Sequence, residues 1–187
     1  MKIISGKYKG RKLVALETND TRPTLTRVKE DIFNVLNSYF IFENKTCLDL
    51  FAGSGSLAIE CISRNIKFAY INDNNSLLQN VIKENLKNIP EIQYSILNKD
   101  YHEALDFLIN NNIKIDLLFL DPPYSQLEVY NEVISKILEN NMLNNYGIIV
   151  CESSLNWTLN SFNNLVLLKN KKYNKLQINI FRLEVEN

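Results

Sequence analysis

The feature that most constrains the fold is an alternation of short apolar strands and amphipathic helices from residue 45 to the end of the chain. Strands are predicted over residues 46–51, 67–72, 92–97, 115–120, 148–151, 165–168 and 176–185, and helices over 56–64, 76–88, 101–111 and 127–140. Strands connected by helices of about ten residues or more form parallel sheets that are covered on both faces. We therefore predict an α/β fold with a mostly parallel, seven-stranded sheet and helices on both of its faces.

The first 40 residues follow a different pattern. Apolar and polar residues alternate around Gly6 and Gly10, which predicts a short β-hairpin. Apolar residues at helical spacing then predict an amphipathic helix over residues 26–39. We expect a small N-terminal extension, a hairpin and a helix, over residues 1–40 and a larger domain over residues 41–187.

The composition, 45% hydrophobic and 22% charged, is ordinary for a globular protein. No apolar run reaches the roughly 18 residues of a membrane span, and the N-terminus lacks the apolar core of a secretory signal, so a cytoplasmic location is expected. Cys47, Cys61 and Cys151 match no zinc-binding spacing, which favours reduced thiols in the core and no metal site. The single histidine, His102, is expected at the surface.

Positive charge is concentrated at the N-terminus, although the net charge of the chain is zero. Residues 1–29 contain eight basic and only two acidic side chains. A smaller basic cluster follows near the C-terminus, at Lys169, Lys171, Lys172 and Lys175. Such a distribution suits contact with phosphates, and a solvated basic face explains it equally well.

Aspartates follow four of the predicted strands, at Asp49, Asp73, Asp100 and Asp121. In an open parallel sheet the ligand binds beyond the carboxyl ends of the strands, so these side chains are expected at one edge. Their recurrence at successive strand ends indicates a binding site more strongly than any one of them does.

The loop after the first of these strands predicts the cofactor. Gly53 and Gly55 allow a tight turn and a close approach of the backbone to a ligand. The buried carboxylate of Asp49 would repel a pyrophosphate but suits an ammonium group, which favours S-adenosylmethionine (SAM) over NAD. Asp73 is placed to bind ribose hydroxyls and Asp100 to bind the adenine amino group. The predicted cofactor-binding residues are Asp49, Phe51, Ala52, Gly53, Gly55, Asp73 and Asp100.

The tetrapeptide Asp121-Pro122-Pro123-Tyr124 indicates the reacting group. Two prolines remove two amide donors, so carbonyls of this segment can face the site without partners in their own chain. The Asp121 carboxylate and the Pro122 carbonyl form a pair of acceptors for one –NH₂ group, and Tyr124 offers a face on which a base can stack. We predict that these four residues hold an exocyclic amine of a nucleic-acid base.

These motifs resemble those of class I SAM-dependent methyltransferases with a Rossmann-like fold, and in particular the RsmD family. The resemblance covers nearly the whole chain, including the glycine-containing segment 1–13, the segment around Thr21-Arg22-Pro23-Thr24, and Lys172-Tyr173 near the C-terminus. It implies methylation of the N2 amine of one guanine in 16S ribosomal RNA, within an assembled or assembling small subunit. It also implies that basic residues of the extension contact RNA or order the extension against the pocket; the candidates are Arg11, Arg22, Arg27 and Lys29.

Two other functions remain open from the sequence. The first is an adenine N6 methyltransferase acting on DNA or RNA, which shares the tetrapeptide but usually carries a sizeable target-recognition domain. The second is a non-catalytic RNA-binding protein that assists ribosome assembly on a methyltransferase scaffold. The intact tetrapeptide and glycine loop argue against the second.

Overall fold

A computed structural model describes residues 1–15, 26–123, 127–159 and 162–185. Seven strands form one sheet in the order β3-β2-β1-β4-β5-β7-β6. Their bounds are β1 Thr46–Asp49, β2 Phe68–Ile71, β3 Tyr94–Ile96, β4 Ile115–Leu120, β5 Leu143–Ser154, β6 Leu165–Lys172 and β7 Leu176–Leu183. The strands β1 to β5 are parallel, whereas β7 lies antiparallel between β5 and β6. The predicted α/β fold is confirmed.

The order of the strands reverses beside β1. The chain first builds outward from β1 to β2 and β3, and then returns to place β4 on the other side of β1. The loops that leave β1 and β4 therefore run to opposite faces of the sheet, and open α/β sheets bind ligands in the crevice at such a point. The loop after Asp49 and the residues Asp121, Pro122 and Pro123 follow these two strands.

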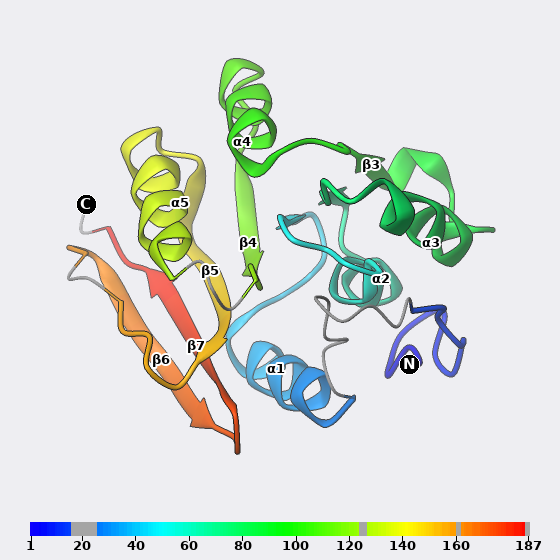
Figure 1. Ribbon diagram of the computed structural model, residues 1–187, viewed down its shortest axis with the longest axis horizontal. Helices are drawn as coiled ribbons and strands as arrows, with labels where there is room; N and C mark the ends of the chain where they lie inside the picture. The colour runs from blue at the N-terminus through cyan, green and yellow to red at the C-terminus, as the bar shows by residue number, and fades with distance from the viewer. Residues whose placement is uncertain (16–25, 124–126, 160–161, 186–187) are drawn as a thin grey trace.

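Five α-helices cover the two faces of the sheet: α1 Thr26–Tyr39, α2 Ser56–Ser63, α3 Ser76–Leu86, α4 Tyr101–Asn110 and α5 Glu128–Glu139. Figure 1 shows α4 and α5 on one side of the sheet and α1, α2 and α3 on the other. The two hydrophobic clusters agree with this arrangement, because one contains Phe33, Ile59 and Ile82 and the other contains Leu105 and Ile134. Within the described ranges, no helix is long and apolar enough to cross a membrane.

The N-terminal segment folds back on itself as the predicted hairpin does, but without regular strands. An isolated antiparallel bridge, Lys2 with Lys12, joins its two arms, and the amide of Ile3 donates a hydrogen bond to the carbonyl of Arg11 at 2.9 Å. The amides of Ile4 and Ser5 donate to the carboxylate of Glu60 on α2, at 2.8 and 3.0 Å. Gly6 permits this close approach, because a Cβ there would lie 1.8 Å from the carbonyl oxygen of Ser63. The division at residue 40 stays a prediction.

Three strands, β3, β5 and β6, differ by several residues from their predicted bounds. A 3₁₀ turn, η1 Glu91–Gln93, replaces the first part of the predicted strand 92–97, since Pro90 begins a turn that the amide of Gln93 closes. β6 continues to Lys172, beyond the predicted end at residue 168, because its polar residues pair with β7. Pairing with β7 also extends β5 to Ser154.

Candidate active site

The loop after β1 is built around a buried carboxylate. Asp49 ends β1 with 2% of its surface exposed, and its Oδ2 accepts a hydrogen bond from the amide of Ala58 at 3.2 Å. Burial, with a smaller contribution from the charge of Asp73, raises the pKa of Asp49 to about 7. Gly53 and Gly55 have φ of 55° and 75°, which favours glycine at both positions. When it is ionised, the buried Asp49 carboxylate can bind a cation.

The structure brings Asp73 to the same loop. Its Oδ2 accepts a hydrogen bond from the amide of Gly53 at 2.8 Å, and its Oδ1 accepts one from the amide of Asn75 at 2.9 Å. Burial raises the pKa of Asp73 in spite of these bonds. Each carboxylate oxygen can accept more than one hydrogen bond, so Asp73 can still accept hydrogen bonds from ribose hydroxyls.

Asp100 and Phe51 border the next part of the edge. Asp100 caps α4 by accepting a hydrogen bond from the amide of His102 at 2.9 Å, which leaves its second oxygen uncommitted to the helix. Phe51 packs against Tyr101, with 5.6 Å between ring centroids. A backbone hydrogen bond positions Ala52, because its amide donates to the carbonyl of Asn72 at 2.8 Å.

Two buried asparagines that sequence reasoning missed hold these loops together. The side chain of Asn72 donates to the carbonyls of Leu50 and Lys99 at 3.1 and 3.0 Å, and so joins the loops that follow β1 and β3. Asn85 on α3 donates to the carbonyls of Ser54 and Val14, at 2.9 and 2.8 Å. The available signal was a polar residue at a strand end (Asn72) and one within the apolar stripe of a helix (Asn85).

The tetrapeptide begins one residue after β4. Asp121 is partly exposed, Pro122 is buried and Pro123 is exposed, whereas Tyr124 lies outside the described residues. Burial, followed by the charges of Glu152 and Asp49, raises the pKa of Asp121 well above its usual range. Among the described residues no hydrogen bond to the Asp121 side chain or to the Pro122 carbonyl is formed.

Three acidic side chains share one face at the carboxyl ends of adjacent strands. Side chains alternate between the two faces along a strand. Cys47, Phe119 and Val150 belong to the cluster under α1, α2 and α3. Asp49, Asp121 and Glu152 each stand two residues further along, on β1, just beyond β4, and on β5 respectively. They therefore face the same side as that cluster. Glu152 was not singled out from the sequence, although it too is an acid at the end of an apolar strand.

The predicted RNA-contacting residues have different environments. Arg27 is exposed at the start of α1 and Arg11 is partly exposed, whereas Arg22 lies outside the described residues. Lys29 has none of its surface exposed, and its Nζ pairs with Glu60 Oε2 at 3.1 Å. Burial is the largest influence on Lys29 and lowers its pKa. Direct contact of Lys29 with a phosphate was therefore a wrong prediction; the residue lies on the inner face of α1.

Lys29 instead helps to order the extension, the other role that the resemblance implied. The same Glu60 carboxylate accepts hydrogen bonds from Arg64, at 3.0 Å, and from the amides of Ile4 and Ser5. The Nζ of Lys29 also donates to the carbonyl of Lys2 at 3.3 Å. This buried network, Lys29-Glu60-Arg64, attaches both the N-terminal segment and α1 to α2.

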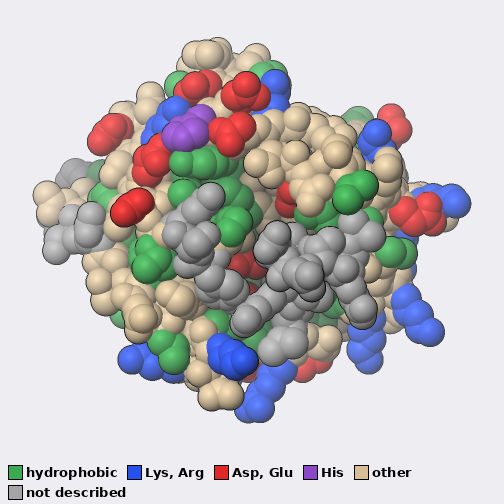
Figure 2. Space-filling model, in the orientation of Figure 1, with side chains coloured by type: hydrophobic (Ala, Val, Ile, Leu, Met, Phe, Trp, Pro, Cys, Tyr) green, Lys and Arg blue, Asp and Glu red, His purple; other side chains and the backbone are tan. Residues whose placement is uncertain are grey.

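Basic side chains gather along the lower edge of the face shown in Figure 2. The elements at that edge in Figure 1 are the N-terminal segment, α1 and the ends of β6 and β7. The exposed residues of these elements include Lys2, Lys7, Lys9, Lys12, Arg27, Lys172 and Lys175. The two basic clusters of the sequence thus lie along one side of the molecule.

The remaining candidate groups are structural. Cys47, Cys61 and Cys151 are free and buried, as predicted. His102 is exposed, as predicted, and its Nδ1 lies 3.1 Å from Glu132 on α5. In the part of the chain that the structure describes, no group of three His, Cys, Asp or Glu side chains could hold a metal ion.

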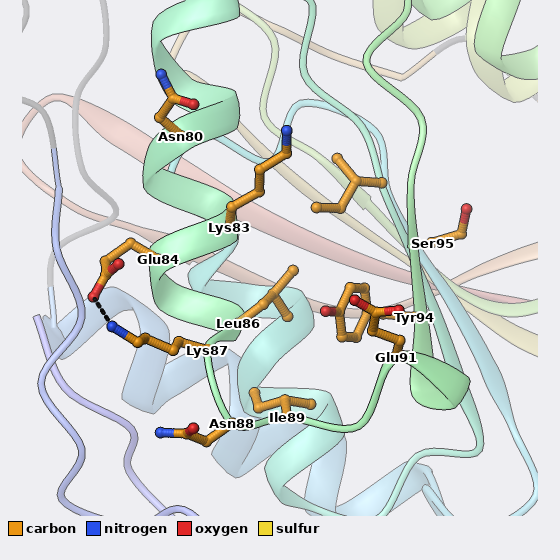
Figure 3. A pocket seen from close by; sticks show the side chains of 11 residues that line it. Asn80, Lys83, Glu84, Leu86, Lys87, Asn88, Ile89, Glu91, Tyr94 and Ser95 are labelled. Carbon is orange, nitrogen blue, oxygen red and sulfur yellow. Dashed lines mark ion pairs between the residues drawn. The ribbon is translucent and has the colours of Figure 1, made fainter.

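A surface groove lies apart from the acidic edge, between α3 and the segment η1–β3 (Figure 3). Lys83 and Leu86 line it from the helix and Tyr94 from β3, and an ion pair between Glu84 and Lys87 at 3.8 Å lies on its rim. Most of its lining belongs to the carboxyl end of α3 and the amino end of β3, so the groove is away from the cofactor loops.

The fold and the acidic crevice define the class to which the protein belongs, the SAM-dependent methyltransferases. In the Escherichia coli protein yhhF, a proposed methyltransferase, the same fold recurs with a TM-score of 0.83 and 27% identity, over 100% of this chain and 99% of that one. SMU.776, a structure solved in complex with SAH, shares the fold alone, with a TM-score of 0.70 and 14% identity over 84% of this chain and 48% of that one.

The sequence then identifies the family. The family described as "Conserved hypothetical protein 95" matches residues 1–182. The Haemophilus influenzae protein named "Ribosomal RNA small subunit methyltransferase D" is 37% identical over 175 residues, which cover 91% of this chain and 88% of that protein. The chain therefore belongs to this family, the RsmD family, as its motifs indicated.

Proposed function

We propose that the protein transfers a methyl group from SAM to the exocyclic N2 amine of a guanine in small-subunit (16S) ribosomal RNA. The observation that carries the proposal is the pair of acceptors, the Asp121 carboxylate and the Pro122 carbonyl, directly after β4 and beside Asp49 at the end of the neighbouring strand. A cofactor and an amine bound at these two strand ends would meet in the crevice where the strand order reverses.

The described residues fit SAM. When bound, SAM supplies a methyl group on a positively charged sulfur, which is electrophilic without help from a metal. The buried Asp49 carboxylate suits the ammonium group of its amino acid moiety, and Asp73 suits its ribose. The position of a Cβ on Gly53 has no atom within 4 Å, so the loop leaves open space there. Asp100, Phe51, Ala52 and Gly55 complete the proposed set.

The proposed work of the tetrapeptide is to prepare the amine. The lone pair of an exocyclic amine is delocalised into the base, so the nitrogen is a poor nucleophile. The Asp121 carboxylate and the Pro122 carbonyl would accept hydrogen bonds from the two N–H groups of the amine. These bonds favour a pyramidal nitrogen and stabilise the positive charge that develops on it. Pro122 and Pro123 fix the backbone in this position, and Tyr124 is proposed to stack on the base. Positioning of this kind can supply much of a reaction rate.

Ribosomal RNA is the proposed substrate because relatives are named ribosomal RNA methyltransferases and because exposed basic residues gather along one side of the molecule. The Haemophilus influenzae and Escherichia coli relatives are both named ribosomal RNA small subunit methyltransferase D. Arg11, Arg22 and Arg27 of the extension, residues 1–40, are proposed to contact phosphates on an assembled or assembling subunit. The base must be unstacked or presented in a loop to reach the crevice. A cytoplasmic location forms part of this proposal.

A product analysis tests the proposal. The purified protein is incubated with labelled SAM and, separately, with undermethylated small subunits, free ribosomal RNA and duplex DNA. Mass spectrometry of the digested nucleosides is expected to find N2-methylguanosine in one or both ribosomal substrates and no labelled product in DNA. Labelled N6-methyladenine, in RNA or DNA, would establish the alternative adenine activity, and absence of any labelled product would contradict both.

A further inference from the structure

Glu152 lies beside the proposed amine-binding pair. β4 and β5 are parallel neighbours that pair from Leu117–Ile148 to Leu120–Cys151, so Asp121 and Glu152 each come one residue after the last pair. Val150 packs in the cluster under α1, α2 and α3, and alternation along β5 turns Glu152 to that same face. The carboxylates of two adjacent strands therefore project toward the same part of the crevice.

The backbone holds Glu152 firmly in this place. Its surface is 5% exposed, and it pairs with Ile178 of β7 across the sheet. The hydroxyl of Tyr130 on α5 donates to the carbonyl of Glu152, and the Tyr130 ring packs against Trp157 at 4.6 Å between centroids. The charge of Glu152 acts directly on Asp121, where it helps to raise the pKa of that carboxyl group. The two side chains are thus neighbours at the ends of adjacent strands, and their charges interact.

The edge of guanine that carries N2 presents two kinds of donor side by side, the N2 amine and N1–H. Adenine presents its amine beside N1, which is an acceptor. Asp121 and Pro122 can hold an amine of either base, so they do not distinguish the two. A second carboxylate next to Asp121 distinguishes them, because it accepts a hydrogen bond from guanine N1–H and repels the lone pair of adenine N1.

We propose that Glu152 is a specificity-determining residue, which accepts a hydrogen bond from the N1–H group of the target guanine and excludes adenine. The inference rests on the proposed function, since it assigns the part of the base that lies next to the methylated amine. A carboxylate that accepts a hydrogen bond from guanine N1–H disfavours an analogue with a lone pair at N1, because two acceptors then face each other.

A base analogue tests this assignment. 2-Aminopurine keeps the amine at C2 but has an acceptor at N1. Small subunits are assembled with either guanine or 2-aminopurine ligated into the modified position, once product analysis has located it. The wild-type protein is expected to prefer guanine by about 100-fold or more in kcat/KM. Glu152→Gln, whose amide can also donate to an N1 acceptor, is expected to lower this preference at least tenfold and to bind SAM with unchanged Kd.

Two further variants separate specificity from structure. Glu152→Asp keeps the charge on a shorter side chain and is expected to keep the preference for guanine at a reduced rate. Glu139→Gln, the same change at an exposed position on α5, is expected to behave as wild type. An unchanged preference in a folded, SAM-binding Glu152→Gln protein, or no methylation of 2-aminopurine by either protein, would overturn the inference. A wild-type protein that does not form N2-methylguanosine would contradict the proposed function itself.

Discussion

At the scale of single residues, the crevice is governed by carboxylates that folding removes wholly (Asp49) or partly (Asp121) from water. Asp49 and Asp121 end neighbouring strands on the same face, and burial raises the pKa of both. A buried carboxylate without a cation or donor is costly, and the cost is relieved when a ligand supplies one. The carboxylates whose burial costs free energy are therefore the ones that favour binding of a cation or a hydrogen-bond donor.

Replacing Asp121 with asparagine is expected to lower kcat about 10²- to 10³-fold, because a neutral amide stabilises the positive charge on the amine far less than a carboxylate does. The Kd for SAM, measured by calorimetry, is expected to stay within about twofold, since binding at Asp49 is retained. Asp106→Asn, on an exposed aspartate of α4, serves as the control. Wild-type activity in a folded Asp121→Asn protein would refute the role of this residue.

The affinity for SAM is expected to rise as the pH increases from 6 to 8. With a pKa of about 7, Asp49 is mostly protonated at pH 6 and mostly ionised at pH 8, and only the ionised form attracts an ammonium group. Calorimetric titrations at several pH values measure this trend. Asp49→Asn is expected to bind SAM more weakly and with a flatter pH dependence, whereas an equal slope in the two proteins would assign the titration to another group.

At the scale of elements, buried polar side chains join segments that are distant in sequence. Lys29-Glu60-Arg64 attaches α1 and the N-terminal segment to α2, and Asn85 joins Val14 to the glycine loop. A second tie lies at the other end of the sheet, where the hydroxyl of Tyr173 donates to Asp31 of α1 at 2.6 Å. These contacts fix α1 and the N-terminal segment against the main domain.

Lys29→Ala is expected to destabilise the protein by about 3 kcal/mol, because it removes one of the two cations, Lys29 and Arg64, that pair with the buried Glu60 carboxylate. Urea unfolding followed by circular dichroism measures the change. The control is Lys87→Ala, which removes the lysine of an exposed ion pair with Glu84; 66% of the Lys87 side chain is accessible to solvent. This change is expected to alter stability by no more than about 0.5 kcal/mol. Equal losses in the two variants would mean that the Lys29 pair is not stabilising in the proposed way.

At the scale of the whole molecule, opposite charges are separated. Acidic groups occupy the floor of the crevice, and lysines and arginines gather along one side of the molecule (Figure 2). The chain has no net charge, so this separation replaces an overall positive charge as the means of attracting a phosphate backbone. The acids can then bind a base and a cofactor cation while the basic side holds the RNA.

Arg27→Gln is expected to weaken RNA binding and to reduce the slope of log K against log salt by about one, which corresponds to the loss of one phosphate contact. SAM affinity is expected to remain unchanged. Lys114→Gln, at the amino end of β4 and thus at the opposite edge of the sheet, is the matched control. Fluorescence anisotropy at several salt concentrations provides the measurement; identical slopes for the two variants would remove Arg27 from the RNA surface.

The sequence by itself determined the mostly parallel sheet, the helices that cover it, and the acids at four strand ends. These features follow from local rules: apolar runs form strands, helical spacing forms helices, and parallel strands end at a common edge. Only the tertiary structure decided the burial of Lys29, the bridging by Asn72 and Asn85, and the position of Glu152 next to Asp121. Whether a polar side chain is buried or exposed depends on partners from other elements, such as Glu60 for Lys29, and no local pattern specifies those partners.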